Sequence, residues 1–134
     1  MAKKDAVLPA PSACIRCGKC VRTCRELVGV NALQMVQKGN VAYVVPNGGD
    51  CMAETTCVSC GNCVSVCPVG ALMPKSQHEF REWEVQKIQT TCAYCGVGCQ
   101  IEFSVKDGVL VDAKPANGPS NQGLLCVKGK FAYD

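Results

Sequence analysis

Cysteine is the residue type in this chain that can do chemistry, and its spacing is regular. Thirteen of the 134 residues are cysteine. Within residues 57–68 (CVSCGNCVSVCP), four cysteines follow one another with two, two and three residues between them, and a proline comes directly after the last. Four thiolates in so short a stretch can surround one metal core, and the spacing C-x2-C-x2-C-x3-C-P is one that holds iron–sulfur clusters.

The other cysteines extend this pattern to three sets of four. The sets are Cys14, Cys17, Cys20 and Cys24; Cys57, Cys60, Cys63 and Cys67; and Cys92, Cys95, Cys99 and Cys126. Because each set can supply the four thiolates of one site, three 4Fe-4S clusters are expected. Cys51 has no partner at a suitable spacing and is expected to be a spare thiol. His78, the only histidine, is expected to lie at the surface, since no set lacks a ligand.

Disulfides and zinc are the alternatives to iron–sulfur clusters. A full set of disulfides fits an odd number of cysteines poorly, and no secretory signal is visible, because Asp5, Pro9 and Pro11 interrupt the stretch after the two N-terminal lysines. Structural zinc uses two Cys-x2-Cys knuckles separated by a spacer, which the third set resembles more than the first two. A zinc-stabilised module for protein or nucleic-acid binding therefore stays open as an alternative.

The charge of the chain argues against nucleic acid as the partner. The formal charge is +3, but a 4Fe-4S core with four thiolates carries roughly −2, so three sites would bring the total to about −3. Lysine and arginine are also scattered rather than clustered along one face. No apolar run is long enough to span a membrane. We therefore expect a cytoplasmic protein that does not insert into membranes.

The first half of the chain contains an internal duplication. Residues 14–24 (CIRCGKCVRTC) and 57–67 (CVSCGNCVSVC) share all four cysteines, a glycine and a valine. A short helix is expected at residues 21–24, where it would carry the fourth cysteine away from the first three. Strands are expected at residues 32–36 and 41–45. Residues 1–13 are expected to form a flexible or extended lead-in.

The second half is expected to position the third set of cysteines. Ser76 with Glu79 fits a capping box, which predicts a short helix that includes Phe80 and Trp83. A strand is expected at residues 84–91.

Beyond that strand, the sequence predicts a hairpin with strands at residues 100–105 and 109–114, because both alternate and Asp107-Gly108 lies between them. The hairpin is a spacer that lets the distant Cys126 complete the third site.

Two stretches resemble known iron–sulfur families. Residues 14–74, with CVSCGNCVSVCPVGAL, resemble the two-cluster ferredoxin segment of iron-only hydrogenases, of the large iron–sulfur subunit of NADH dehydrogenase and of extended formate dehydrogenases. Residues 90–134, with TTCAYCGVGCQIEF and GLLCVKGKFAYD, resemble the N-terminal 4Fe-4S domain of molybdopterin formate dehydrogenases. The resemblance implies a small α+β fold: a duplicated bacterial ferredoxin-like domain followed by a small β-hairpin 4Fe-4S domain.

The ferredoxin resemblance also implies crossed ligation, in which the fourth cysteine of each run binds the cluster of the other run. The implied ligands are Cys14, Cys17, Cys20 and Cys67 for cluster 1; Cys57, Cys60, Cys63 and Cys24 for cluster 2; and Cys92, Cys95, Cys99 and Cys126 for cluster 3. In the formate dehydrogenase family the lysine two residues after the last cluster cysteine lies between cluster and pterin, and Lys128 occupies that position. The expected domains are a flexible lead at 1–13, a two-cluster domain at 14–75, a helix–strand linker at 76–90 and a formate-dehydrogenase-type 4Fe-4S domain at 91–134.

These features predict an electron-transfer subunit without a catalytic site of its own. It is expected to relay single electrons through three 4Fe-4S clusters within a hetero-oligomer. The expected partners are redox proteins: a hydrogenase, a flavoprotein diaphorase or a formate dehydrogenase. The alternative is an N-terminal electron-relay fragment of a molybdopterin formate dehydrogenase, since the molybdenum or tungsten site of that family lies beyond the resembling residues.

Overall fold

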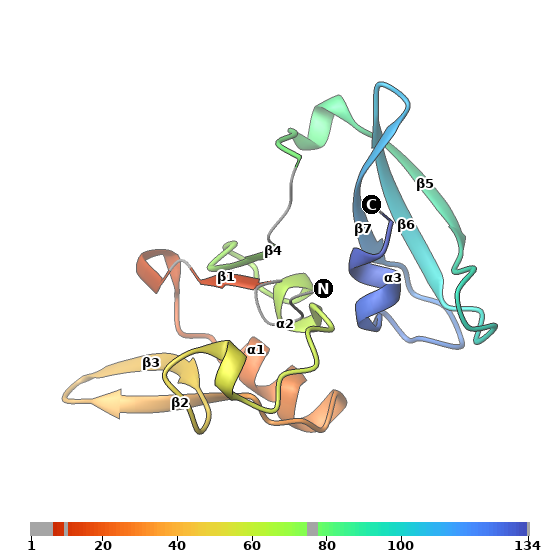
Figure 1. Cartoon of the computed structure of the whole chain (residues 1–134). Helices are drawn as coiled ribbons and strands as arrows, with labels where there is room; N and C mark the ends of the chain where they lie inside the picture. The colour runs from red at the N-terminus through yellow and green to blue at the C-terminus, as the bar shows by residue number, and fades with distance from the viewer. Residues whose placement is uncertain (1–6, 10, 75–77, 134) are drawn as a thin grey trace. The chain divides into compact units, whose positions relative to one another are not determined.

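The computed structural model describes residues 7–9, 11–74 and 78–133, and the chain forms two compact units. The first unit is Met1–Lys75 and the second is Ser76–Asp134. Both consist of short helical turns and small antiparallel sheets (Figure 1). The expected small α+β class is thus confirmed. None of the helices in the described residues is long and apolar enough to span a membrane.

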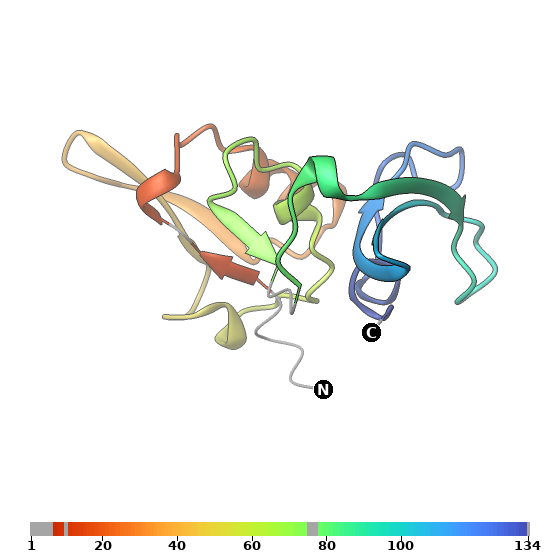
Figure 2. The same cartoon turned by 90° about the horizontal axis from the view of Figure 1, so that it is seen from above.

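Two short sheets frame the first unit. Strands β2 (Leu33–Lys38) and β3 (Val41–Pro46) correspond to the two expected strands and form a hairpin, which extends away from helices α1 (Lys19–Arg22) and α2 (Asn62–Ser65) (Figure 2). Strand β1 (Val7–Pro9) pairs with β4 (Leu72–Pro74). Residues 7–9 of the N-terminal lead are therefore extended and are fixed by pairing with the strand that follows the second cysteine run.

Each helical turn described in the first unit contains a cysteine or lies next to one. They are η1 (Pro11–Ala13), α1 (Lys19–Arg22), the π-helical turn η2 (Thr23–Leu27), the 3-10 turn η3 (Met52–Glu54) and α2 (Asn62–Ser65). The helix expected at residues 21–24 begins two residues earlier, because Gly18 adopts φ 71° and ends the cysteine loop directly before Lys19. It then widens into η2, a rare geometry that is often found at functional sites.

The second unit is a three-stranded antiparallel sheet with one helix. Its strands are β5 (Gln86–Thr91), β6 (Gln100–Lys106) and β7 (Val109–Pro115), in the order β5-β6-β7. The hairpin expected around Asp107-Gly108 is confirmed, and both turn residues have positive φ (51° and 79°), as a tight hairpin turn requires. The strand expected at 84–91 also exists, but it pairs with β6 and so forms one edge of this sheet.

The helix expected from Ser76 to Trp83 is wrong in its described part. Ser76 lies outside the described residues, and residues 78–81 are not helical. Only a 3-10 turn forms, η4 (Glu82–Glu84), which is held by two hydrogen bonds between Arg81 and Glu84: the Arg81 N–H donates to the Glu84 carboxylate at 3.0 Å, and the Glu84 N–H donates to the Arg81 carbonyl at 2.9 Å. Trp83 is 79% exposed, so it supplies no buried face that would extend the turn into a helix.

A buried lysine fastens helix α3 (Val127–Phe131) to the sheet. Lys130 is 3% exposed, and its ammonium group donates to the Ala113 carbonyl at 2.6 Å and lies 3.7 Å from the Asp112 carboxylate. Burial lowers the pKa of Lys130, and the nearby Asp112 carboxylate acts in the opposite direction. The lysine thus links the helix that follows Cys126 to strand β7.

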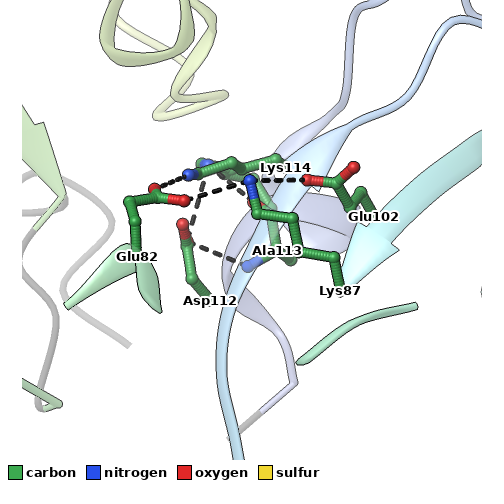
Figure 3. A network of polar contacts seen from close by, with 7 residues as sticks. Glu82, Lys87, Glu102, Asp112, Ala113 and Lys114 are labelled. Atoms are coloured by element: carbon green, nitrogen blue, oxygen red, sulfur yellow. Dashed lines mark hydrogen bonds and ion pairs between the residues drawn. The ribbon is translucent and has the colours of Figure 1, made fainter. Parts of the chain in front are cut away.

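An exposed charge network ties η4 to the same sheet. The Glu82 carboxylate accepts from Lys114 at 2.5 Å and from Lys87 at 3.0 Å, while Lys87 also lies 3.8 Å from Glu102 (Figure 3). Each pair is solvent-exposed and therefore contributes little by itself. Together they hold the segment before β5 against strands β5 and β7.

Candidate metal centres

The loops of the first two cysteine runs share left-handed backbone angles at two equivalent positions. Arg16 and Ser59 occupy equivalent positions and have φ of 60° and 54°, and Gly18 and Gly61 have φ of 71° and 74°. A left-handed arginine or serine is uncommon and persists where its surroundings hold it. Such a turn can direct a backbone N–H group toward a cysteine sulfur: the Ser59 N–H donates to the Cys57 sulfur at 3.4 Å.

One cavity in the first unit joins the fourth cysteine of run one to three cysteines of run two. Cys24, Cys57, Cys60 and Cys63 all line it. Cys24 is 8% exposed, and the Ala32 N–H donates to its sulfur at 3.2 Å. The rest of the wall is mainly apolar and consists of Val28, Val30, Leu33, Met52 and Val58.

Two thiols of this cavity, those of Cys60 and Cys63, have raised pKa values and are difficult to ionise on their own. Burial raises the pKa of Cys63 to about 12, and the neighbouring cysteines of both runs add to this effect. Burial also raises the pKa of Cys60, with Cys57 and Cys24 adding to the rise and the Asn62 N–H opposing it. A buried set of thiolates needs a positively charged partner, so the donor set fits a metal core.

Among the other predicted ligands of the first unit, Cys20 and Cys67 have pKa values that are shifted in opposite directions. Burial raises the pKa of Cys20, and Cys14 and Cys17 lie near enough to add to the rise. Burial also acts to raise the pKa of Cys67, but backbone N–H groups that hydrogen-bond its sulfur outweigh burial and lower that pKa. These N–H groups belong to Val69, Leu72, Ala71 and Gly70. The structure thus groups Cys14, Cys17 and Cys20, whereas the assignment of Cys67 to them stays a prediction.

The third set lies wholly in the second unit. Cys92 and Cys99 flank the loop between β5 and β6, and the Cys92 N–H donates to the Cys99 carbonyl at 2.8 Å. Cys126 immediately precedes α3. Burial raises the pKa of Cys99, and Cys92, Cys95 and Cys126 add to the rise, which indicates that the four sulfurs lie near one another. Cys92 and Cys99 also pack against the small core of Ile101, Ala113 and Leu125.

Asn121 holds the loop that returns the chain to Cys126. Its side-chain oxygen accepts from the Gln100 N–H at 3.0 Å, and its amide donates to the carbonyls of Ala116 at 2.9 Å and Leu124 at 3.0 Å. Asn121 is 8% exposed. The side chain therefore connects both sides of the third set: Gln100 follows Cys99, and Leu124 lies two residues before Cys126.

We expect the substitution Asn121→Ala to weaken the second unit and its hold on the third metal site. Backbone groups left buried without a partner should lower the free energy of unfolding by about 1–3 kcal/mol. Anaerobic urea denaturation of the metal-loaded protein measures this change. The matched control is Asn117→Ala, since Asn117 lies in the same loop but is exposed. An equal loss in both variants would contradict the role of Asn121.

Three residues singled out by the sequence lie in different places. Lys128 is exposed in the first turn of α3, two residues after Cys126. Cys51 is exposed and precedes η3. His78 is half-buried at the start of the described part of the second unit.

The N–H donors to the fourth cysteines are not evident from the cysteine spacing. An Ala-Leu pair follows each run, at Ala32-Leu33 and Ala71-Leu72. Ala32 donates to Cys24, and the Ala71 N–H lies at Cys67. The repeated pair was the available signal, but its distance from the cysteine differs: eight residues in the first run and four in the second. The π-helical turn η2 lies at the start of the longer interval.

Comparison with known families gives two matches along the chain. Residues 13–71 and 56–102 match the 4Fe-4S dicluster domain, and residues 85–134 match the molybdopterin oxidoreductase Fe4S4 domain. These matches cover all three sets of cysteines.

Known proteins that resemble the chain are oxidoreductase subunits. An NADH-quinone oxidoreductase subunit of Rhizobium meliloti is 39% identical over 123 residues, which is 90% of this chain and 14% of that protein. The alpha subunit of NADPH-Fe(3+) oxidoreductase of Geobacter sulfurreducens is 35% identical over 124 residues, 92% of this chain and 14% of that protein. A formate dehydrogenase-like protein of Staphylococcus aureus is 32% identical over 124 residues, 91% of this chain and 12% of that protein. The chain thus spans only a small part of the length of these relatives.

Proposed function

Because this chain belongs to the 4Fe-4S dicluster and molybdopterin oxidoreductase Fe4S4 domain families, we propose that it relays single electrons through three 4Fe-4S clusters. The observation that carries the proposal is the cavity that Cys24 shares with Cys57, Cys60 and Cys63. When bound, each cluster would accept and return one electron. The chain itself supplies thiolate ligands, N–H donors and exclusion of water.

The proposed ligand sets follow the crossed arrangement. They are Cys14, Cys17, Cys20 and Cys67 for cluster 1; Cys57, Cys60, Cys63 and Cys24 for cluster 2; and Cys92, Cys95, Cys99 and Cys126 for cluster 3. The shared cavity supports the second set, and the mutual effects on the pKa of Cys99 support the third. Cys67 is assigned to the first set by the symmetry of the two runs.

We also propose that the first unit is a duplication and that the two units act as separate domains. Matching φ values at Arg16 and Ser59 and at Gly18 and Gly61 support the duplication. The proposed domains are 14–75 for the two-cluster part and 91–134 for the third site, with 76–90 between them.

Backbone N–H groups give the chain control over how readily each site accepts an electron. A hydrogen bond to sulfur stabilises the additional negative charge of a reduced site. At site 2 single N–H groups act on Cys24, Cys57 and Cys60, whereas at site 1 four N–H groups act on Cys67 alone. Site 1 should therefore favour the reduced state more than its neighbour does.

The proposed partners are redox subunits of an oxidoreductase complex. The relatives named for NADH-quinone, NADPH-Fe(3+) and formate oxidoreduction support this setting. The chain would serve either as a separate subunit beside a hydrogenase, diaphorase or formate dehydrogenase, or as the relay segment of a longer molybdopterin oxidoreductase. In the second case Lys128, which is exposed beside Cys126, would lie between cluster 3 and the pterin. No catalytic residue is proposed, and 13 free cysteines suit a reducing compartment such as the cytoplasm.

Metal and sulfide analysis of anaerobically purified protein tests the proposal. We expect a brown protein with about twelve irons and a similar amount of acid-labile sulfide per chain, from three four-iron sites. Fewer than about eight irons in fresh protein would contradict three clusters. A colourless protein with about three zinc ions would instead support the zinc-stabilised alternative.

A further inference from the structure

Met52 lies at the second cluster site although it is not a ligand. We propose that Met52 covers the cavity of cluster 2, excludes water from it and thereby keeps the reduction potential of that cluster low. This inference rests on the proposed function. It assigns a task to the segment between the two cysteine runs, which contributes no ligand.

The cavity contacts identify Met52 as part of this site. Its side chain is half-buried and lines the same cavity as Cys24, Cys57, Cys60 and Cys63. The remaining apolar wall is Val58 of run two together with Val28, Val30 and Leu33, which follow run one, so Met52 is the cavity residue that comes from just before run two. A thioether side chain is flexible and polarisable, which suits it to cover an irregular sulfur-rich surface.

The segment around Met52 is fixed to the ligand run by Thr55. The Thr55 hydroxyl donates to the Met52 carbonyl at 2.8 Å and accepts from the N–H of Cys57 at 3.2 Å. The same hydroxyl thus joins the cover to the first ligand of run two. The next residue, Thr56, donates to the Val30 carbonyl at 2.5 Å, which ties the segment to the part of the cavity wall that follows run one.

Two further hydrogen bonds hold a tight turn around Met52. The Asp50 N–H donates to the Glu54 carboxylate at 2.8 Å, and the Glu54 N–H donates to the Cys51 carbonyl at 3.1 Å. A Cβ atom at Gly49 would lie 2.6 Å from the Glu54 Cβ, so this approach requires glycine. The backbone that carries Met52 is therefore held at both ends.

Water exclusion follows from elementary electrostatics. An electron that enters the site adds one negative charge to a set of thiolates in an apolar cavity, and water would stabilise that charge. A polar side chain in place of Met52 should admit water and raise the potential. The change should be confined to cluster 2, because Met52 lines the cavity of that cluster's ligands.

Redox titration monitored by EPR tests this role in the full, iron-loaded chain. We expect Met52→Gln to raise the potential of one cluster, to leave the other two unchanged and to accelerate air bleaching of that cluster several-fold. Met52→Leu, which keeps an apolar cover, should leave all three potentials unchanged. Met73→Gln is the matched surface control, since Met73 is 45% exposed on β4. The affected signal should be the one that disappears in Cys24→Ala.

A second variant keeps the test decisive if Met52→Gln fails to hold iron. Thr55→Val removes the hydroxyl bridge but keeps the shape of the side chain, and it should raise the same potential by a smaller amount. The inference is overturned if both iron-loaded variants titrate like wild type, or if the potential of another cluster moves instead. Failure of the proposed function looks different, because the wild-type protein itself would then lack iron.

Discussion

The Cys24→Ala variant is expected to lose cluster 2, although Cys24 belongs to the other cysteine run. Its thiol lines the cavity of Cys57, Cys60 and Cys63 and accepts the Ala32 N–H at 3.2 Å. Without the fourth thiolate, the site should lose up to about four of about twelve irons. Iron analysis and EPR of the reduced protein measure the loss.

Comparison with variants of the other ligands makes this test specific. Cys60→Ala removes a ligand assigned to cluster 2, and Cys17→Ala removes one assigned to cluster 1. The spectrum of Cys24→Ala should match that of Cys60→Ala, and the spectrum of Cys67→Ala should match that of Cys17→Ala. The reverse pairing would show that each run binds its own cluster and that the crossed assignment is wrong.

Crossed ligation also has a structural consequence for the first unit. Its sheets have only two strands each, and its buried apolar residues are few and small, such as Ala32, Leu33 and Ala71. So small a core contributes little stability by itself. Two metal cores that each bind both runs would connect the halves, so removal of the metal should unfold this unit.

The sequence predicted the local elements well where strong short-range signals exist. The hairpin at Asp107-Gly108 follows from turn chemistry, and the strand at Val41–Pro46 follows from its β-branched residues. The helix predicted from the capping box does not form at residues 78–81, because a capping box only starts a helix and the exposed Trp83 gives these residues no apolar face to bury.

Long-range contacts were harder to predict because no periodicity reports them. Strand β5 was expected in a linker, yet it pairs with β6 and thereby brings Cys92 beside Cys99. Asn121 stands in a polar loop where an asparagine would ordinarily face solvent, yet its buried side chain closes that loop. Lys130 resembles a surface residue in sequence, but its burial depends on Asp112 and Ala113 of another strand.

At the metal sites too, the local features could be predicted from the sequence, whereas the contacts with distant residues could not. Spacing alone grouped the cysteines, because three ligands of each set lie within a few residues. The environment of the sulfurs depends on distant residues: Ala32 donates to Cys24, and Met52 lines the cavity from the intervening segment. These contacts require the folded chain, so the sequence could indicate the metal cores but not what surrounds them.

The Cys99→Ser variant is expected to lose cluster 3 alone and to leave the first unit folded. All four ligands proposed for that cluster come from the second unit, Ser76–Asp134. About four of about twelve irons should be lost, and two of three EPR signals should remain. Loss of all three signals together would contradict the independence of the two units.

A matched substitution separates the loss of metal from the loss of packing in this experiment. Cys99 packs against the core of Ile101, Ala113 and Leu125, whereas Cys95 is exposed. Cys95→Ser should therefore lose the same EPR signal but destabilise the second unit less than Cys99→Ser does, because only the latter puts a hydroxyl against an apolar core. Equal unfolding midpoints of the two variants in anaerobic urea titrations would mean that the metal, rather than this packing, dominates the stability of the unit.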